Sequence, residues 1–146
     1  AHALGLGVTA WSPLAGGMLT GKYHGGGTAN GRYQNEMMKG FLPDPERVSR
    51  VVTALRGISR ETKIPAARIA LAWLLQRPQP VIPIIGTTKI GQLTDNIAAL
   101  DVRLSREQLK LLDDASAVSL GFPHEFYQRD LVRTFAYGGL RDRIVT

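Results

Sequence analysis

Two polar turns in this 146-residue chain each follow a β-prone run of residues. Ser12-Pro13 ends the run Val8–Trp11, and Gly86-Thr87-Thr88-Lys89 follows the apolar run at residues 81–85. Ligands of parallel α/β sheets bind at the carboxyl ends of the strands. If both runs are strands of one parallel sheet, the two turns therefore predict a shared binding site.

The second turn has the features of an anion site. The free backbone N–H groups at the start of a helix attract negative charge. Thr87, Thr88 and Lys89 add two hydroxyl groups and a positive charge at that place. These features predict a phosphate ligand, and the alternative is that Thr88 only caps the helix while Lys89 is a solvated charge.

A glycine-rich segment follows the first turn, since eight of the 16 glycines lie between residues 16 and 40. This composition predicts a long loop. Glycine permits close backbone approach, and Lys22 and Arg32 add positive charge, so the loop could wrap a nucleotide diphosphate. The segment matches neither a Walker loop nor a GxGxxG fingerprint, and the alternative is a flexible surface loop without a ligand. Trp11 could offer its flat face to a planar ring, or it could lie in the core.

The remaining polar residues give weaker signals. His2, His24 and His124 are scattered without metal-ligand spacing, so we expect no metal site. Helix capping and solvation explain Asp44 and the Asp113-Asp114 pair. The tail after residue 119 mixes arginine with aromatic residues, a composition that could suit nucleic acid. No recognised binding motif accompanies it, so we expect no nucleic-acid partner.

The composition narrows the class of protein. The chain is 44% hydrophobic and carries 18 Lys+Arg against 12 Asp+Glu, which gives a formal charge of +6 and suits one globular core rather than a disordered chain. No apolar run approaches the roughly 18–20 residues that a membrane span needs. The lack of cysteine excludes disulfides, thiolate metal sites and cysteine nucleophiles. We expect a cytoplasmic protein, and the start at Ala1 predicts a processed, tagged or truncated product.

The elements that would position the two turns can be predicted from local patterns. Asp44-Pro45 predicts the start of an amphipathic helix. A second helix is expected over residues 65–77, and its segment at residues 70–75 is apolar all round. The continuous apolar run at residues 81–85 is typical of a strand covered on both faces in a parallel sheet. A third helix should follow, with an apolar stripe formed by Ile90, Leu93, Ile97 and Leu100.

A capping box at Ser105 to Gln108 predicts one more short helix, which ends near residue 115. The tail after residue 119 shows no clear period. The alternation of strands and helices predicts an α/β fold.

Three segments resemble the C-terminal part of the aldo-keto reductases, whose fold is the (β/α)8 TIM barrel. The segments are GVTAWSPLAGGMLTGKY at residues 7–23, ALAWL at residues 70–74 and IPIIGTTKIGQLTDN at residues 82–96. The resemblance extends weakly to Tyr137-Gly138-Gly139 and thus covers residues 1–146 as one partial domain. It is closest to the branch that includes bacterial reductases and the potassium-channel β-subunits. It implies that the two strands are the seventh and eighth of the barrel.

The resemblance also implies an NADP(H) site. Trp11 would stack on the nicotinamide ring, and the loop along the pyrophosphate would comprise Ser12, Pro13, Leu14, Ala15, Gly17, Leu19, Lys22 and Arg32. Gly86, Thr88 and Lys89 would lie at the adenosine 2′-phosphate. The adenine end would be formed by Gln92, Asp95 and Asn96.

The chain departs from the family in its catalytic residues. Aldo-keto reductases use a Tyr acid assisted by Lys and Asp, and a His that orients the carbonyl, all from the first half of the barrel. The four tyrosines here, Tyr23, Tyr33, Tyr127 and Tyr137, fall outside that pattern. We therefore expect a fragment that lacks catalytic residues and is inactive alone, with on the order of 190 barrel residues missing.

Such a fragment would need partners. We expect either an N-terminal barrel half, which would bring the small carbonyl substrate, or a homo-oligomer. The alternative function is an NADP(H)-binding sensory or accessory subunit with little turnover.

Overall fold

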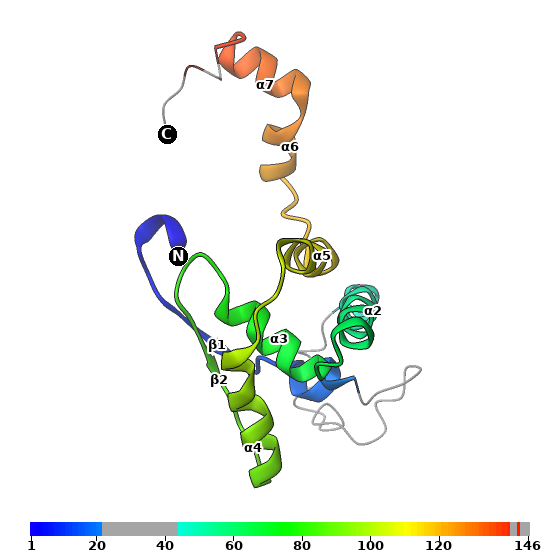
Figure 1. Ribbon diagram of the computed structural model, residues 1–146. Helices are drawn as coiled ribbons and strands as arrows, with labels where there is room; N and C mark the ends of the chain where they lie inside the picture. Colours follow the sequence, from blue (N-terminus) through cyan, green and yellow to red (C-terminus); the bar gives the residue numbers. More distant parts are fainter. Residues whose placement is uncertain (22–43, 141–142, 144–146) are drawn as a thin grey trace, which may run out of the picture. The chain divides into compact units, whose positions relative to one another are not determined.

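This computed structural model describes residues 1–21, 44–140 and 143 and has two compact units, the larger of which contains a sheet of two parallel strands (Figure 1). Strand β1 (Val8–Trp11) pairs with β2 (Val81–Ile84), with Val8 opposite Val81 and Trp11 opposite Ile84. Both predicted strands and their parallel pairing are confirmed. The larger unit comprises Ala1–Ser116 and the smaller one Ala117–Thr146.

Two helices lie in the described part of the chain between the strands, as predicted. Helix α2 (Pro45–Thr62) begins where Asp44 accepts a 3.0 Å hydrogen bond from the backbone N–H of Glu46 and where Pro45 occupies the first turn. Helix α3 (Ala66–Leu75) follows, and five of its residues are buried. Short 3-10 turns complete the path before and after β1, at His2–Leu4 (η1) and Ala15–Thr20 (η2).

The second half of the larger unit contains three more elements. These are helix α4 (Ile90–Ile97), the 3-10 turn η4 (Ala98–Asp101) and helix α5 (Arg106–Ser116). The predicted capping box is present, because the Ser105 N–H donates to Gln108 Oε1 at 3.0 Å and the Gln108 N–H donates to Ser105 Oγ at 3.2 Å. The capping box therefore starts α5 close to where the sequence predicts it.

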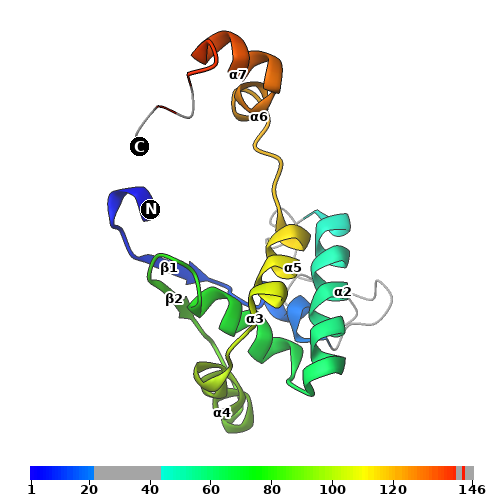
Figure 2. The ribbon, with the colours of Figure 1, turned by 45° about the horizontal axis from the view of Figure 1, so that its top comes forward.

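The core lies among the helices rather than between the strands. Figure 2 shows α2 and α5 side by side, and α3 contacts both α2 and β2. The buried side chains that form this core are Ala54, Leu55, Ile58, Ala66, Ile69, Ala70, Ala72, Val102, Leu104 and Leu112. The larger unit is thus a helical layer with a two-stranded sheet on one side of it.

A polar cluster joins α3 to α5 at the edge of this core. Asp113 accepts hydrogen bonds from the Trp73 indole and from the Arg77 guanidinium, both at 2.7 Å. The Arg77 guanidinium also lies 4.3 Å from the centre of the Trp73 ring. Gln76 adds a second link, because its side chain accepts from the Leu104 N–H at 3.1 Å. Capping and solvation therefore do not explain Asp113, which ties two helices together.

One face of the sheet is uncovered among the described residues. Trp11 is 65% exposed, Ile82 62% and Ile84 50%, so the prediction of a strand covered on both faces is wrong here, and so is a core location for Trp11. The apolar stripe of α4 is also exposed, with Ile90 at 84%. The described part of the chain thus leaves apolar side chains exposed on the sheet and on α4.

The smaller unit contains two helices that the sequence reading missed. They are α6 (His124–Gln128) and α7 (Asp130–Tyr137), and α7 ends where Gly138 adopts a left-handed conformation with φ 52°. The Gly138-Gly139 pair is the signal of a helix end that could have revealed α7. Among residues 1–21, 44–140 and 143, no helix is both long enough and apolar enough to span a membrane.

The Asp113 cluster yields a stability prediction. Asp113→Ala should lower the free energy of unfolding by about 1–2 kcal/mol, because a half-buried guanidinium and an indole N–H lose their acceptor. Urea denaturation followed by circular dichroism measures this change.

The neighbouring Asp114 provides the matched control. It pairs with Lys110 on the surface of the same helix, and both side chains are largely exposed. Asp114→Ala should therefore cost less than about 0.5 kcal/mol. Equal losses in the two variants would contradict the role given to Asp113.

Candidate functional site

A cavity of about 410 Å³ lies at the carboxyl ends of both strands. It is bounded by the loop after β1, the turn after β2, the start of α3 and one side of α4. The lining residues are Trp11, Ser12, Pro13, Leu14, Gly16, Gly17, Thr20, Pro65, Ala67, Ile84, Ile85, Gly86, Thr87, Gln92, Asp95 and Asn96. The parallel pairing of β1 and β2 thus brings the two predicted turns to one site.

The loop after β1 has a backbone fixed by its own residues. Gly16 and Gly17 adopt positive φ values of 62° and 99°, which glycine tolerates without strain. The Gly16 N–H donates to Ser12 Oγ at 3.2 Å, and Thr20 Oγ1 donates to the Gly17 carbonyl at 2.7 Å. These bonds hold a tight turn directly after Trp11, with little side-chain bulk along the cavity wall.

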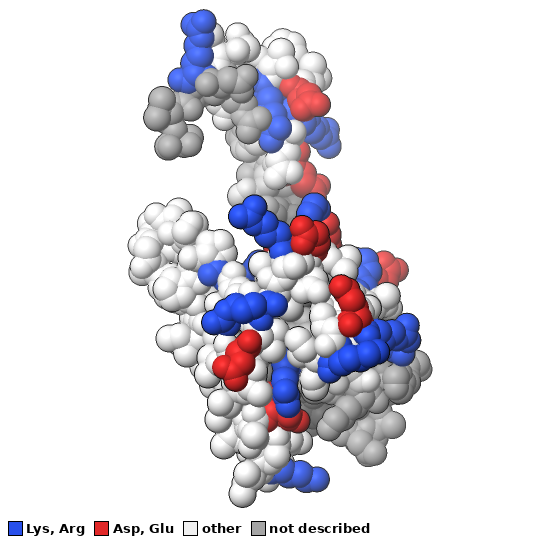
Figure 3. Space-filling model, viewed as in Figure 1, with Lys and Arg blue, Asp and Glu red and all other residues white. Residues whose placement is uncertain are grey.

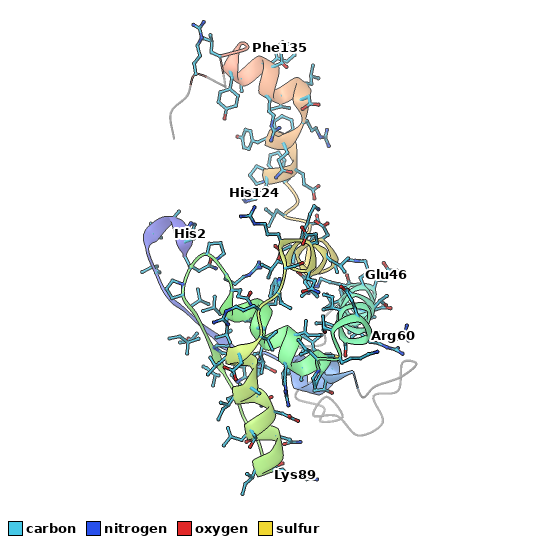
Figure 4. All side chains as sticks on the ribbon, viewed as in Figure 1. His2, Glu46, Arg60, Lys89, His124 and Phe135 are labelled. Atoms are coloured by element: carbon cyan, nitrogen blue, oxygen red, sulfur yellow. The ribbon has the colours of Figure 1, made fainter. Side chains whose placement is uncertain are left out.

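The turn after β2 leads into α4, and Lys89 rather than Thr88 occupies the N-cap position. No described side chain caps this helix, so the alternative in which Thr88 is only a cap is wrong. Thr87 lines the cavity, whereas Thr88 and Lys89 are exposed outside its lining. Figure 4 shows Lys89 at the free end of α4. The first turn of α4 therefore offers backbone N–H groups without a side-chain cap.

Helix α4 contributes polar side chains farther along the cavity. Gln92, Asp95 and Asn96 all line it, as the resemblance implies. The Asp95 carboxylate accepts a hydrogen bond from the Arg68 guanidinium of α3. The sequence did not indicate Arg68 or the lining residues Thr20, Pro65 and Ala67. For Arg68 and Ala67 the reason is that no local pattern marks which residues of α3 face α4.

The predicted site residues thus divide into four groups. Those in the lining are Trp11, Ser12, Pro13, Leu14, Gly17, Gly86, Gln92, Asp95 and Asn96. Ala15 and Leu19 instead line a second, apolar cavity of about 260 Å³ among α2, α3 and α5, and Pro13 lines both cavities. Thr88 and Lys89 lie outside the lining, and Lys22 and Arg32 fall outside the described residues.

The charge distribution does not form a single basic stripe on the face of the molecule that Figure 3 shows, where basic and acidic side chains are interspersed. Among the described residues, no three His, Asp or Glu side chains gather as metal ligands would. The lining itself contains amide, hydroxyl and backbone groups and one carboxylate that is already paired. This set is suited to binding a polar ligand rather than a metal ion.

Several known proteins are similar in sequence to most of this chain. The uncharacterized oxidoreductase YrpG of Bacillus subtilis (strain 168) is 37% identical over 116 residues, which are 78% of this chain and 33% of that protein. A probable voltage-gated potassium channel subunit beta of Oryza sativa subsp. japonica is 40% identical over 101 residues, 67% of this chain and 31% of that protein. A probable aldo-keto reductase 1 of Glycine max is 33% identical over 116 residues, 77% of this chain and 32% of that protein.

The chain thus spans about one third of the length of these relatives. The family model described as the aldo/keto reductase family matches residues 1–117, which include the whole larger unit and both turns of the site. The chain belongs to the aldo/keto reductase family.

Proposed function

We propose that this chain is the NADP(H)-binding part of an oxidoreductase that reduces aldehydes or ketones by hydride transfer. One observation carries the proposal: a single cavity joins the exposed Trp11 at the end of β1 to the polar side of α4. A flat aromatic face at one end and hydrogen-bonding side chains at the other match the two ends of a dinucleotide. The family match supports the oxidoreductase class.

The residues of the cavity fit such a cofactor. The Trp11 ring is 65% exposed and free to stack on a planar ring. The Ser12 to Gly17 loop would follow the pyrophosphate, and the amides of Gln92 and Asn96 would bind the adenine end. When bound, the cofactor supplies the hydride for carbonyl reduction. The chain's own residues would bind and orient it.

We further propose that β1 and β2 are the seventh and eighth strands of a (β/α)8 barrel in a cytoplasmic enzyme. The exposed face of the sheet and the exposed stripe of α4 support this, because the other strands and helices of a barrel would cover both. The N-terminal half would supply the catalytic Tyr, Lys, Asp and His and would bind the carbonyl substrate. The alternative partner for the uncovered faces is a second copy of the chain.

A sensory or accessory subunit is the second candidate function. It is favoured by the 40% identity to the probable potassium channel subunit beta of Oryza sativa subsp. japonica. In this role the protein would bind NADP(H) and turn over slowly. Steady-state assays of the intact protein with a panel of aldehydes distinguish the two, because a reductase should process at least one of them rapidly.

The stacking role predicts a loss of affinity on removal of the Trp11 ring. Trp11→Ala should raise the Kd for NADPH about three- to tenfold, which is the effect of losing one aromatic stacking contact. Isothermal titration calorimetry on the intact protein measures it. Thr9→Ala, which alters an exposed side chain of β1 outside the cavity, serves as the control. An unchanged Kd in the Trp11 variant would contradict the proposal.

The phosphate role of Lys89 predicts a change in cofactor preference. Lys89→Glu should weaken NADPH binding about tenfold and leave NADH binding nearly unchanged, because only NADPH carries the 2′-phosphate that the new carboxylate would repel. Lys110→Glu makes the same charge change in α5, away from the cavity. If both variants behave alike, the effect is one of net charge and the role of Lys89 is wrong.

The absence of the catalytic residues from this sequence predicts that the purified 146-residue chain does not oxidise NADPH in the presence of aldehydes. Absorbance at the NADPH band measures the rate, and the intact protein is the positive control. Turnover by the pure chain at a rate comparable to the intact protein would show that residues 1–146 contain their own proton donor.

A further inference from the structure

An ion pair between α3 and α4 borders the candidate cofactor cavity. The Arg68 guanidinium binds the carboxylate of Asp95, and Asp95 is part of the cavity lining whereas Arg68 is not. The Arg68 side chain is 31% exposed and that of Asp95 is 58% exposed. Among the described residues, Arg68 Nε is buried without a hydrogen-bond partner, so Asp95 is the group that holds the guanidinium in place.

Asp95 poses a problem for an anionic ligand. Among the described residues it is the one acidic member of the lining, and it lies one helical turn from Gln92 and next to Asn96. An unpaired carboxylate there would repel a phosphate and would favour the free hydroxyl groups of a ribose, which it can bind by hydrogen bonding. An unpaired Asp95 would thus select the dinucleotide without the extra phosphate.

Arg68 changes this charge balance. The Arg68 guanidinium lies against the Asp95 carboxylate, so the pair presents almost no net charge to the cavity. We propose that Arg68 is a positioning residue that sets the preference for the phosphorylated dinucleotide by neutralising Asp95. The inference rests on the proposed function, since it assumes that a dinucleotide occupies the cavity.

A purely structural role makes different predictions. If the pair only tied α3 to α4, its loss would weaken both cofactors equally. If Arg68 instead reached the phosphate directly, the loss of Asp95 would not compensate for the loss of Arg68. The three possibilities are therefore distinguished by measuring the affinities for NADPH and for NADH in variants of Arg68, of Asp95 and of both.

The experiment measures the Kd of the intact protein for NADPH and for NADH and takes their ratio as the preference. Arg68→Gln should lower the preference for NADPH about fivefold, because it exposes one carboxylate charge to the extra phosphate. Arg68→Lys keeps the charge and should keep the preference. Asp95→Asn should raise it, and the double variant Arg68→Gln/Asp95→Asn should return it to the wild-type value.

Ionic strength gives an independent measurement on the same variants. The loss of preference in Arg68→Gln should shrink as salt rises from about 0.05 M to about 1 M, because salt screens the exposed carboxylate. Thermal unfolding checks that each variant is folded. Asp95→Asn tests the idea separately if Arg68→Gln does not fold.

Several outcomes would overturn the inference. A ratio that is unchanged in Arg68→Gln, or unchanged in Asp95→Asn, shows that the Asp95 charge does not affect cofactor choice. A double variant as defective as Arg68→Gln alone shows direct contact of Arg68 with the ligand. If the wild-type protein binds neither cofactor, the proposed function itself fails and the inference fails with it.

Discussion

The parallel pairing of β1 with β2 is the constraint on which the candidate site depends. The two strands are separated by about 70 residues of sequence, yet the pairing of Trp11 with Ile84 brings their carboxyl ends to the same edge. Every side chain of a strand changes face when the register moves by one residue. A shifted register would therefore turn Trp11 toward α3 and remove the aromatic end of the cavity. The aromatic end of the candidate site therefore depends on the register of the two strands as well as on the Trp11 side chain.

Among the described residues, helices cover only one face of the two-stranded sheet. The core of the larger unit lies among α2, α3 and α5, and the polar cluster of Trp73, Arg77 and Asp113 fixes α5 on α3. The opposite face of the sheet, with Ile82 and Ile84, contributes nothing to this core. The helical layer thus gives the strands a stable support, while the uncovered face and the exposed stripe of α4 are free for further contacts. The buried core and the uncovered apolar face of the sheet thus lie on opposite sides of the same two strands.

Local signals in the sequence predicted most of the elements and the meeting of the two turns, whereas the individual cofactor-binding residues were implied by the family resemblance and stay predictions. The Asp44-Pro45 start of α2, the capping box of α5 and both strands depend on residues that are neighbours in the chain, and all of them are present. The Arg68–Asp95 pair joins residues 27 positions apart, so no local pattern could reveal it. The residues alone left open whether Trp11 is accessible or lies in the core. They did not predict the exposure of the α4 stripe, because apolar residues indicate burial without telling which surface supplies it. Thr87 replaced Thr88 in the lining because α4 begins one residue later than its hydroxyl residues suggest.

Pro13 stands in the wall between the candidate cofactor cavity and the apolar cavity beneath it, and it lines both. The apolar cavity and the candidate site therefore share this residue in their linings. Any larger side chain that fills the apolar cavity to improve packing would press on the loop that carries Ser12 and Leu14. The apolar cavity offers space for stabilising substitutions, but filling it would move the loop after β1 that borders the candidate site. Pro13 would thus link the packing of the apolar cavity to the position of the loop that borders the candidate site.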